Sequence, residues 1–183
     1  MVNEIAIIWM SAGNSYFDEK TVKKLLEYAS KNFERIVVIS PDKPAEHNFR
    51  ALGYPENKVR RKAKLNANLL INRIKRILNS RGDKSKFKIV DWESEIMNNK
   101  HYISELNQMK KLYINNLNFR KTVKETTLEF LNNKINNYPR KSLDEASLYL
   151  IEELSFVLAS PKIYGSNNVK YLYHKNWKIF EDF

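Results

Sequence analysis

The sequence predicts an α/β fold built on a parallel sheet with flanking helices. Two observations lead to this prediction: short, mainly apolar strand-like segments lie at residues 5–10, 36–39 and 87–90, and segments with apolar residues at helical spacing separate them. Strands that alternate with helices pair in parallel through right-handed crossovers, so this βαβαβ order implies a parallel sheet. The length of 183 residues and the apolar content of 43% suit one globular domain with a substantial core.

The connections around the second strand are a helix and a loop. Residues 19–30 carry apolar side chains at helical spacing and form an amphipathic helix. The second strand ends at Ser40-Pro41-Asp42, where turn-forming residues stop the apolar run. We expect a loop containing Pro44 to follow, ending in the turn Gly53-Tyr54-Pro55.

The remainder of the chain is mainly helical. A long helix runs from Pro55 to about residue 79 and is closed by Ser80-Arg81-Gly82. Beyond the third strand we expect three helical segments, at 99–117, 119–134 and 142–158. Breaks fall at Pro139-Arg140 and Ser160-Pro161, and a last strand covers residues 169–174. Because the sequence shows no repeat or linker, we expect a single domain over residues 1–183.

Composition narrows the class of protein. The sequence has no cysteine, which excludes disulfides and thiolate chemistry and favours a reducing cytoplasm. Its apolar runs fall far below the ~20 residues that span a bilayer, and its first residues lack the basic region of a signal peptide. The 32 Lys and Arg against 21 Asp and Glu give a net charge of +11, which favours a polyanionic partner. Solubility in a Lys- and Asn-rich chain is the alternative explanation.

Cationic residues concentrate in the long helix. Residues 58–79 contain eight Lys and Arg and no acidic residue. We expect the apolar face of this helix to consist of Leu65, Leu69 and Ile77, with Ala63 or Ile74. The cations form a stripe ~30 Å long, and like charges at i,i+4 repel, so an external counter-charge such as phosphate is indicated. A membrane-surface helix and an ordinary solvated helix are the alternatives.

A hydroxyl-rich turn follows the first strand. Residues 11–17 read Ser-Ala-Gly-Asn-Ser-Tyr-Phe and place Ser11 at the carboxyl end of a strand, where open α/β sheets have their ligand crevices. Taken alone, these residue types favour a helix cap or turn over a nucleophile. The sequence has only His47, His101 and His174 as histidines and no nucleophile elbow, which argues against a serine hydrolase. An already activated ester, however, would need no strong base.

Tyr149 and Glu153 form a second constellation. Their i,i+4 spacing puts both on one helix face, where a phenol and a carboxylate can hold an ammonium group or pass a proton. Spacing alone favours the simpler interpretation, a surface Glu beside a core Tyr. We find no motif for a metal site, and the four glycines do not cluster into a phosphate-binding loop.

Several separated motifs occur together along nearly the whole chain. In order, they are residues 11–17, Asn32-Phe33-Glu34-Arg35, the basic helix, Tyr149-x-x-x-Glu153, Ala159-Ser160-Pro161 and Tyr173-His174. In this set and order the chain resembles the cyclodipeptide synthases, a family that uses two aminoacyl-tRNAs to make a cyclic dipeptide (a 2,5-diketopiperazine).

The resemblance implies a Rossmann-like fold similar to the catalytic domain of class I aminoacyl-tRNA synthetases. Ser11 matches the nucleophile that takes the aminoacyl group from the first aminoacyl-tRNA and becomes an acyl-enzyme. Tyr149 and Glu153 match the residues that hold the amino group, and Glu153 also assists proton transfer. The second aminoacyl-tRNA then gives a dipeptidyl-tRNA, which cyclises.

The same resemblance implies further residues and partners. Tyr173 matches a tyrosine implicated in proton relay during cyclisation, and Asn14, Tyr173 and His174 fit the family's Asn-Tyr-His subgroup. No ATP, metal or other cofactor is implied, because aminoacyl-tRNA arrives as an activated ester. We expect tRNA to bind along the basic helix, at Arg60, Arg61, Lys62, Lys64, Arg73, Lys75 and Arg76.

Six residues are expected by position to line the first aminoacyl pocket: Ile7, Trp9, Ile39, Pro41, Trp92 and Tyr171. Trp9 departs from the family pattern, because many members have a small residue such as glycine two positions before the nucleophile. The rings of Trp9, Trp92 and Tyr171 suggest a flat first substrate, aromatic or imidazole. Tyr171 and Tyr173 should share one face of the last strand.

Two other functions stay open at this point. A non-catalytic tRNA-binding module could keep the fold without the acyl transfer, and an ATP-dependent ligase would catalyse pyrophosphate exchange. We favour a monomer.

Overall fold

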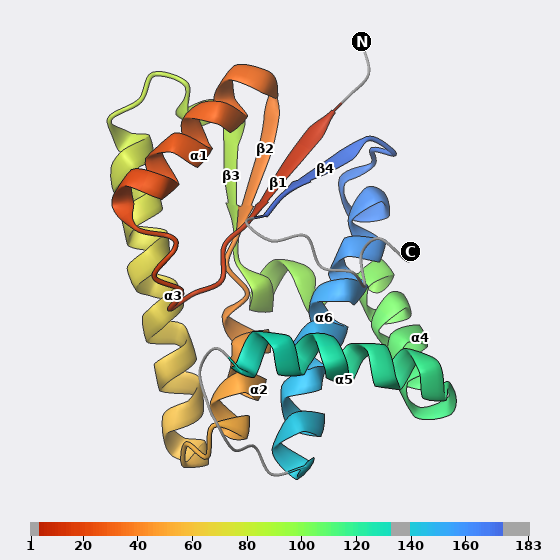
Figure 1. Ribbon diagram of the computed structural model, residues 1–183. Coiled ribbons are helices and arrows are strands. Elements are labelled where there is room, and N and C mark those ends of the chain that lie inside the picture. Colours follow the sequence, from red (N-terminus) through yellow and green to blue (C-terminus); the bar gives the residue numbers. More distant parts are fainter. Residues whose placement is uncertain (1–3, 133–139, 174–183) are drawn as a thin grey trace.

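The protein contains a four-stranded parallel sheet, seen in a computed structural model that describes residues 4–132 and 140–173 (Figure 1). The strands are β1 (Ile5–Trp9), β2 (Arg35–Ile39), β3 (Phe87–Val90) and β4 (Val169–Leu172). Their order across the sheet is β3-β2-β1-β4, so that β4 pairs with the edge of β1 that β2 leaves open. The predicted parallel sheet with flanking helices is confirmed.

Strand β1 is buried along its whole length because both faces of the sheet are covered. Ala6 and Ile8 point into one apolar cluster, while Ile7 and Trp9 point into the other. A continuous apolar run rather than an alternating one is what a strand covered on both faces requires.

Helices α1 (Glu19–Asn32) and α3 (Glu56–Asn79) cover one face of the sheet (Figure 1). The α1 helix begins at Asp18, whose carboxylate accepts a 2.7 Å hydrogen bond from the backbone N–H of Thr21. This side-chain cap satisfies one of the donors that every helix start leaves open.

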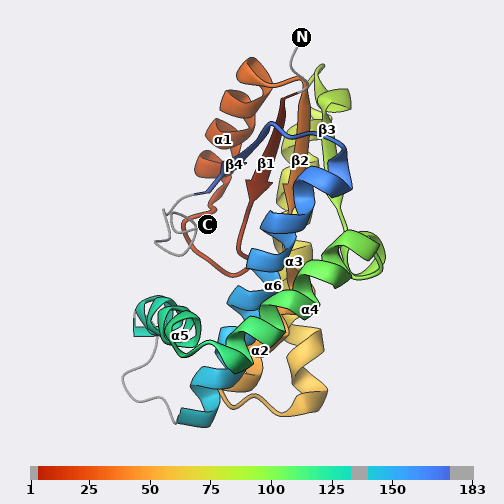
Figure 2. The same cartoon turned by 90° about the vertical axis from the view of Figure 1, so that its right-hand side faces the viewer.

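The opposite face is covered by α6 (Arg140–Tyr164), by the short turn η2 (Trp92–Ile96) and by α4 (Lys100–Asn115) (Figure 2). Helix α5 (Leu117–Asn132) packs against α4 and α6 rather than against the sheet. A short helical turn, η1 (Lys84–Lys86), leads into β3. In the described ranges, 4–132 and 140–173, none of the helices combines the length and apolarity that a membrane span requires.

The structure corrects the prediction of a loop after β2. Residues 42–51 form a helix, α2 (Asp42–Ala51), that packs on α3 and α6. Pro44 lies in its first turn, where backbone N–H groups have no partner within the helix, so the proline removes no hydrogen bond.

A second correction concerns Ser160-Pro161, which does not break α6. The helix continues to Tyr164, although Pro161 has no N–H to offer the carbonyl of Val157. That carbonyl accepts a 2.8 Å hydrogen bond from the Tyr171 hydroxyl and lies 2.9 Å from Ser160 Oγ. Hydroxyl groups thus replace the lost helical bond. The predicted break at Pro139-Arg140 begins outside the described residues.

The buried face of α3 also differs from the predicted one. Ala63, Ile74 and Ile77 are buried as expected, but Leu65 and Leu69 are 51% and 60% exposed. The buried stripe instead continues through Val59, Ala67, Leu70 and Leu78. Two leucines therefore stand on the outer side of α3, among its cations.

Candidate active site

The site lies where the order of the strands reverses. Chain order leads from β1 to β2 and β3 in one direction, whereas β4 is added on the other side of β1. Ser11 follows β1 and Tyr173 follows β4, so both stand at the carboxyl ends of neighbouring parallel strands. Such a switch point is where open α/β sheets leave a crevice for ligands.

Four side chains from three segments meet at this point. Ser11 Oγ lies 3.2 Å from the Tyr173 hydroxyl, within hydrogen-bond distance. Tyr149 and Glu153 reach the same place from successive turns of α6, and the Tyr149 hydroxyl interacts with Glu153 and Ser11. Glu153 is only 3% exposed, so the simpler interpretation, a surface carboxylate, is wrong.

Burial controls the protonation of this pair. Removal from water raises the pKa of Glu153 to about 8, although hydrogen bonds from Tyr149 and Trp9 act in the opposite direction. Burial, followed by the nearby Glu153 and Tyr173, also raises the pKa of Tyr149 well above its ordinary value. Both shifts favour the neutral, protonated forms of Glu153 and Tyr149.

Trp9 contacts this site directly. Its indole Nε1 donates a 2.7 Å hydrogen bond to Glu153 Oε1, and both side chains are buried. The Trp9 ring packs on Trp92 and Phe156, with ring centroids 5.8 Å and 5.2 Å away. The three rings pack against one another between β1 and α6. The flat first substrate suggested by the sequence stays a prediction.

The other four residues predicted to line the first aminoacyl pocket do not all lie together. Ile7 and Ile39 belong to the same buried cluster as Trp9 and Trp92. Pro41 is the residue before α2, and Tyr171 supports α6 through its hydroxyl. Tyr171 and Tyr173 both face α6, as expected for residues two apart on a strand.

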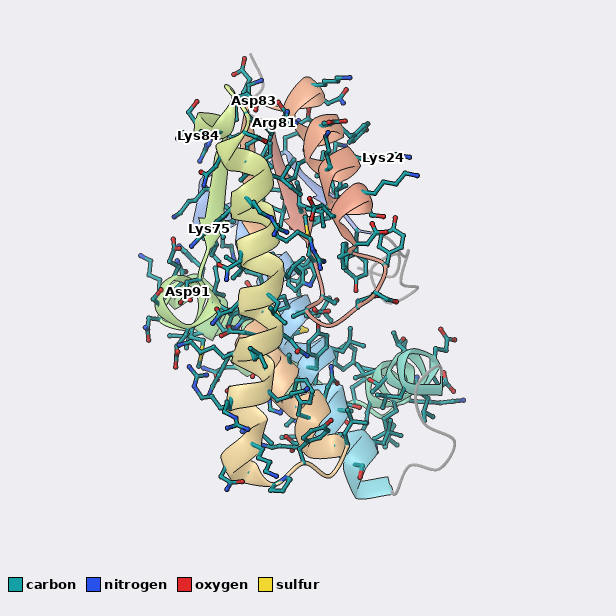
Figure 3. The ribbon with its side chains drawn as sticks, turned by 90° about the vertical axis from the view of Figure 1, so that its left-hand side faces the viewer. Lys24, Lys75, Arg81, Asp83, Lys84 and Asp91 are labelled. Atoms are coloured by element: carbon teal, nitrogen blue, oxygen red, sulfur yellow. The ribbon has the colours of Figure 1, made fainter. Side chains whose placement is uncertain are left out.

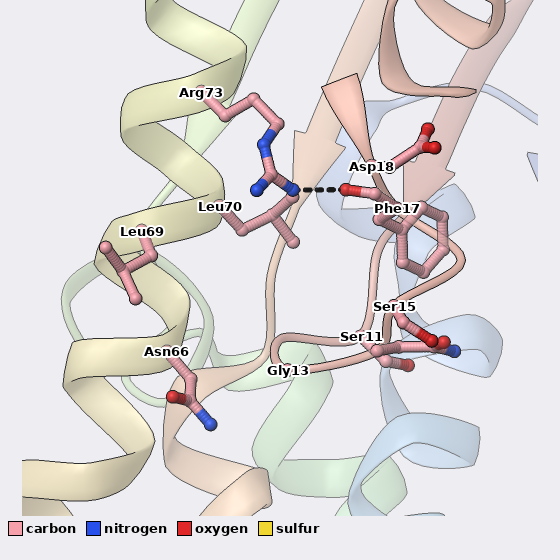
Figure 4. Close-up of a pocket in the computed structure, with 10 residues that line it drawn as sticks. Ser11, Gly13, Ser15, Phe17, Asp18, Asn66, Leu69, Leu70 and Arg73 are labelled. Carbon is pink, nitrogen blue, oxygen red and sulfur yellow. Dashed lines mark hydrogen bonds between the residues drawn. The ribbon is translucent and has the colours of Figure 1, made fainter. Parts of the chain in front are cut away.

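An open cavity lies on the other side of the Ser11 turn. It has a volume of about 290 Å³ and separates residues 11–18 from α3 (Figure 4). Its lining combines hydroxyls, amides, apolar side chains, one carboxylate and one cation, from Ser11, Gly13, Asn14, Ser15, Phe17, Asp18, Asn66, Leu69, Leu70 and Arg73. Sequence reasoning found Ser11, Asn14 and Arg73 but missed the others, because no local pattern shows which face of α3 meets the turn.

Two contacts hold the turn against α3. Arg73 donates a hydrogen bond to the carbonyl oxygen of Phe17. Gly13 has a φ of +78°, and a Cβ added there would lie 2.9 Å from the amide nitrogen of Asn66. Glycine is thus favoured at this position both by its backbone conformation and by the close approach of Asn66.

One known family matches almost the whole chain. A model of the family described as Cyclodipeptide synthase matches residues 3–183. The chain belongs to the cyclodipeptide synthase family. It is 26% identical over 164 residues to the Cyclo(L-leucyl-L-phenylalanyl) synthase of Streptomyces noursei, a match that covers 90% of this chain and 67% of the relative. The protein is accordingly an enzyme of the aminoacyltransferase kind.

Solved structures share the fold of this cyclodipeptide synthase. A Mycobacterium tuberculosis protein, described as showing that cyclodipeptide synthetases are related to type I tRNA synthetases, matches with a TM-score of 0.84 at 22% identity. That match covers 98% of this chain and 77% of the other. A cyclodipeptide synthase of Candidatus Glomeribacter gigasporarum, bound to Phe-tRNAPhe, matches with a TM-score of 0.67 at 13% identity, over 96% and 90% of the two chains. The expected Rossmann-like fold is confirmed.

Two residues of the Asn-Tyr-His subgroup have a described place in this synthase. Tyr173 lies at the site, and Asn14 organises the turn, because its side-chain oxygen accepts a 3.0 Å hydrogen bond from the N–H of Tyr16. His174 lies outside the described residues. Assignment to the subgroup stays a prediction.

The basic helix of this synthase is less free of counter-charges than its sequence suggests. Arg60 pairs with Glu46 of α2 and Glu93 of η2, and Arg76 pairs with Glu19 of α1. These acidic partners come from other elements, so the local sequence could not show them. Among the described residues, no ion pair forms with the exposed cations Arg61, Lys62, Lys64 and Lys75, the last labelled in Figure 3.

Three partly buried ionisable side chains link α2 to α6. His47 of α2 lies 2.8 Å from Glu145 and 3.3 Å from Glu152, one carboxylate at each ring nitrogen. Burial lowers the pKa of His47, but the hydrogen bonds to these two carboxylates raise it more. Over the two described ranges of the chain, no three acidic or histidine side chains are grouped so that they could hold a metal ion.

Proposed function

We propose that the protein joins two amino acids into a cyclic dipeptide, using two aminoacyl-tRNAs and an aminoacyl-Ser11 intermediate. The meeting of Ser11, Tyr149, Glu153 and Tyr173 at the strand switch point is the observation that carries this proposal. Membership of the family supports it, and a member of the same fold has been solved bound to Phe-tRNAPhe.

In the first step Ser11 Oγ attacks the carbonyl carbon of the aminoacyl ester. The bond from that carbon to the ribose oxygen breaks, and the tRNA leaves with a free hydroxyl. The Tyr173 hydroxyl, 3.2 Å from Ser11 Oγ, accepts the serine proton and passes its own proton to the ribose oxygen. A strong base is unnecessary because the ester arrives activated.

Tyr149 and Glu153 hold the amino group of the acyl-enzyme. Glu153 is protonated in the empty site, since its pKa is raised to about 8 by burial. An ammonium group beside it favours the carboxylate, so binding releases the Glu153 proton to solvent and forms an ion pair. The Tyr149 hydroxyl supplies a second polar partner.

Two further transfers complete the product. The neutral amino group of the second aminoacyl-tRNA attacks the Ser11 ester, forming a peptide bond while Ser11 Oγ regains a proton. The result is a dipeptidyl-tRNA. Its ammonium group then gives up one proton to the Glu153 carboxylate, and the resulting amine attacks the carbonyl carbon of the remaining ester. A second proton passes from the attacking nitrogen through the Tyr173 hydroxyl to the ribose oxygen, so that the ring closes and the second tRNA leaves with a free hydroxyl.

Cations of the basic helix supply the affinity for tRNA. The exposed Arg61, Lys62, Lys64 and Lys75 offer phosphate contacts without first breaking an ion pair, whereas Arg60 and Arg76 must exchange a carboxylate for a phosphate. We place Arg73 at the edge of the active site, because it lines the cavity beside Ser11.

Substitution of the nucleophile tests this function. With a labelled aminoacyl-tRNA, wild-type protein should become covalently labelled and release a cyclic dipeptide detectable by mass spectrometry. Ser11→Ala should lose both while keeping its affinity for tRNA. A non-catalytic tRNA-binding module would instead show no label in either protein, and a ligase would show ATP-dependent pyrophosphate exchange.

A further inference from the structure

The active site has two sides, and they differ in what they can accept. On the α6 side of Ser11, buried Tyr149 and Glu153 are backed by the packed rings of Trp9 and Phe156. On the α3 side lies the open cavity of about 290 Å³. A substrate whose ester carbon meets Ser11 must extend into both sides, because the acyl part and the leaving part are bonded to the same carbon.

The α3 side matches the chemistry of a nucleoside. Leu69 is 60% exposed and supplies apolar surface for the face of a base, whereas Leu70 and Phe17 are buried and line the cavity with only a small part of their surface. Asn66 supplies an amide for the edge of the base. The described residues give the Asn66 side chain no hydrogen-bond partner, so the amide is available to a ligand. The volume is at the low end of the ~300–1,000 Å³ range of ligand pockets and suits a single nucleoside.

Two cations on α3 extend this match. Arg73 lines the cavity, as does the carboxylate of Asp18, whereas Lys62 lies outside the lining. Lys62, Asn66, Leu69 and Arg73 are spaced by four, three and four residues, so they share one face of α3. The sequence of groups along that face is therefore cation, amide, leucine, cation. Arg73 uses one of its five N–H donors on the Phe17 carbonyl, which leaves others for a phosphate oxygen.

We propose that the cavity between the Ser11 turn and α3 binds the 3′-terminal adenosine of the aminoacyl-tRNA, with Leu69 against the base and Asn66 at its edge. This assignment rests on the proposed function, because it takes the ester of that adenosine as the group attacked by Ser11. It also gives a function to Leu69, which is exposed and does not belong to the hydrophobic core within the described chain.

The test combines a change in the tRNA with a change in the cavity. A tRNA with its terminal adenosine replaced by cytidine is charged with the same amino acid, and the rate of Ser11 acylation is measured below saturation. In wild-type protein we expect this replacement to slow acylation at least tenfold. Leu69→Glu, which puts a charge against the base, should slow acylation by the adenosine tRNA at least tenfold and reduce the replacement effect to less than threefold.

Leu65→Glu is the matched control. Leu65 lies one turn from Leu69 on the same helix, is 51% exposed against 60%, and does not line the cavity. Both variants lower the charge of α3 equally, so a purely electrostatic effect on tRNA would appear in both. We expect Leu65→Glu to keep the tenfold effect of the terminal replacement. Asn66→Ala is a second cavity variant and should also weaken that effect.

The outcomes separate the two proposals. An equal effect of terminal replacement in wild type, Leu69→Glu and Leu65→Glu would overturn the adenosine site while leaving acyl transfer intact. The adenosine site would also be overturned if Leu69→Glu transferred a different amino acid while the effect of replacing the terminal adenosine stayed unchanged. The cavity would then hold the side chain of the amino acid. Failure of wild type to acylate Ser11 would refute the proposed function. Binding of the two uncharged tRNAs to the same three proteins would then decide the cavity by itself.

Discussion

The indole nitrogen of Trp9 donates a 2.7 Å hydrogen bond to the carboxyl of Glu153, across 144 residues of sequence. This bond links the end of β1 to the middle of α6 and joins the strand that carries Ser11 to the helix that carries Tyr149. A bulky side chain at position 9 therefore does two things. It fills the α6 side of the site, and it supplies a donor to the buried acid.

Removal of the donor alone should change how Glu153 titrates. Trp9→Phe keeps a large ring but loses the N–H that lowers the pKa of Glu153, so this pKa should rise above its present value of about 8. We expect the pH profile of Ser11 acylation to shift to higher pH. Trp92→Phe is the control, since Trp92 belongs to the same cluster without bonding Glu153, and an equal shift in both variants would contradict this explanation.

Removal of the whole side chain should alter the products. Trp9→Gly empties the space between β1 and α6 that the indole occupies, so larger first amino acids should be accepted. Loss of a buried Trp costs about 3–5 kcal/mol in related core substitutions, so the variant should also be less stable. Mass spectrometry of the cyclic dipeptides made from a full set of charged tRNAs checks this prediction. An unchanged set of products would place the indole outside the substrate's path.

The local parts of the fold and site were accessible from the sequence. The apolar runs of β1 and β2 predict their strands because buried parallel strands are continuously apolar. Strand β3 lies at the edge of the sheet and has an exposed Lys88 among its apolar residues. Tyr149 and Glu153 share a helix face because of their i,i+4 spacing, which holds in α6. The position of Ser11 at the end of β1 follows from the length of the first apolar run.

The remaining features depend on contacts between distant segments. Nothing in residues 169–172 shows that β4 joins the sheet beside β1, and this choice is what brings Tyr173 to Ser11. The α2 helix forms although Pro44 argues against it, because its buried Glu46 takes hydrogen bonds from Lys43, Arg50 and Arg60. Exposure of Leu69 likewise depends on which face of α3 meets the sheet.

The raised pKa of Glu153 should appear in the pH dependence of stability. The unfolded chain loses this proton near pH 4.5, whereas the folded protein keeps it until about pH 8. The stabilising contribution is therefore complete below pH 4.5 and is lost as the pH rises toward 8. At about 1.4 kcal/mol per pKa unit, the loss amounts to about 5 kcal/mol.

Glu153→Gln isolates this effect, because the amide has nearly the same shape and no proton to lose. Urea unfolding at pH 5, 7 and 9 should show a free energy of unfolding that falls more steeply with pH in wild type than in Glu153→Gln. His47 also loses stabilisation as the pH rises, because its folded pKa is raised, but it contributes equally to both proteins. Parallel curves would show that Glu153 is ionised in the folded protein at neutral pH.

The close approach of Gly13 to α3 predicts a site-specific effect of an added methyl group. Gly13 and Gly53 have φ values of +78° and +77°, so alanine is strained at both positions, by about 1–2 kcal/mol. Only at Gly13 would the new Cβ meet another side chain, Asn66 at 2.9 Å. Gly13→Ala should therefore reduce acylation of Ser11 more than Gly53→Ala does at similar stability. Relative to Asn66→Gly alone, Gly13→Ala should then reduce acylation less than it does in the wild-type background, because the clash is gone. An equal reduction in both backgrounds would place the defect in the turn itself.

The exposed cations of α3 should determine the salt dependence of tRNA use. Neutralising Arg61, Lys62 and Lys64 to Gln removes three cations without breaking an ion pair among the described residues, so any loss is one of phosphate contacts. Each contact contributes about 0.7–0.9 to the slope of log affinity against log salt, and the triple variant should flatten that slope by about 2–3. The control neutralises Lys20, Lys23 and Lys24, which are exposed on α1 and change the net charge equally. Equal flattening in both triple variants would mean that net charge, rather than the α3 stripe, attracts the tRNA.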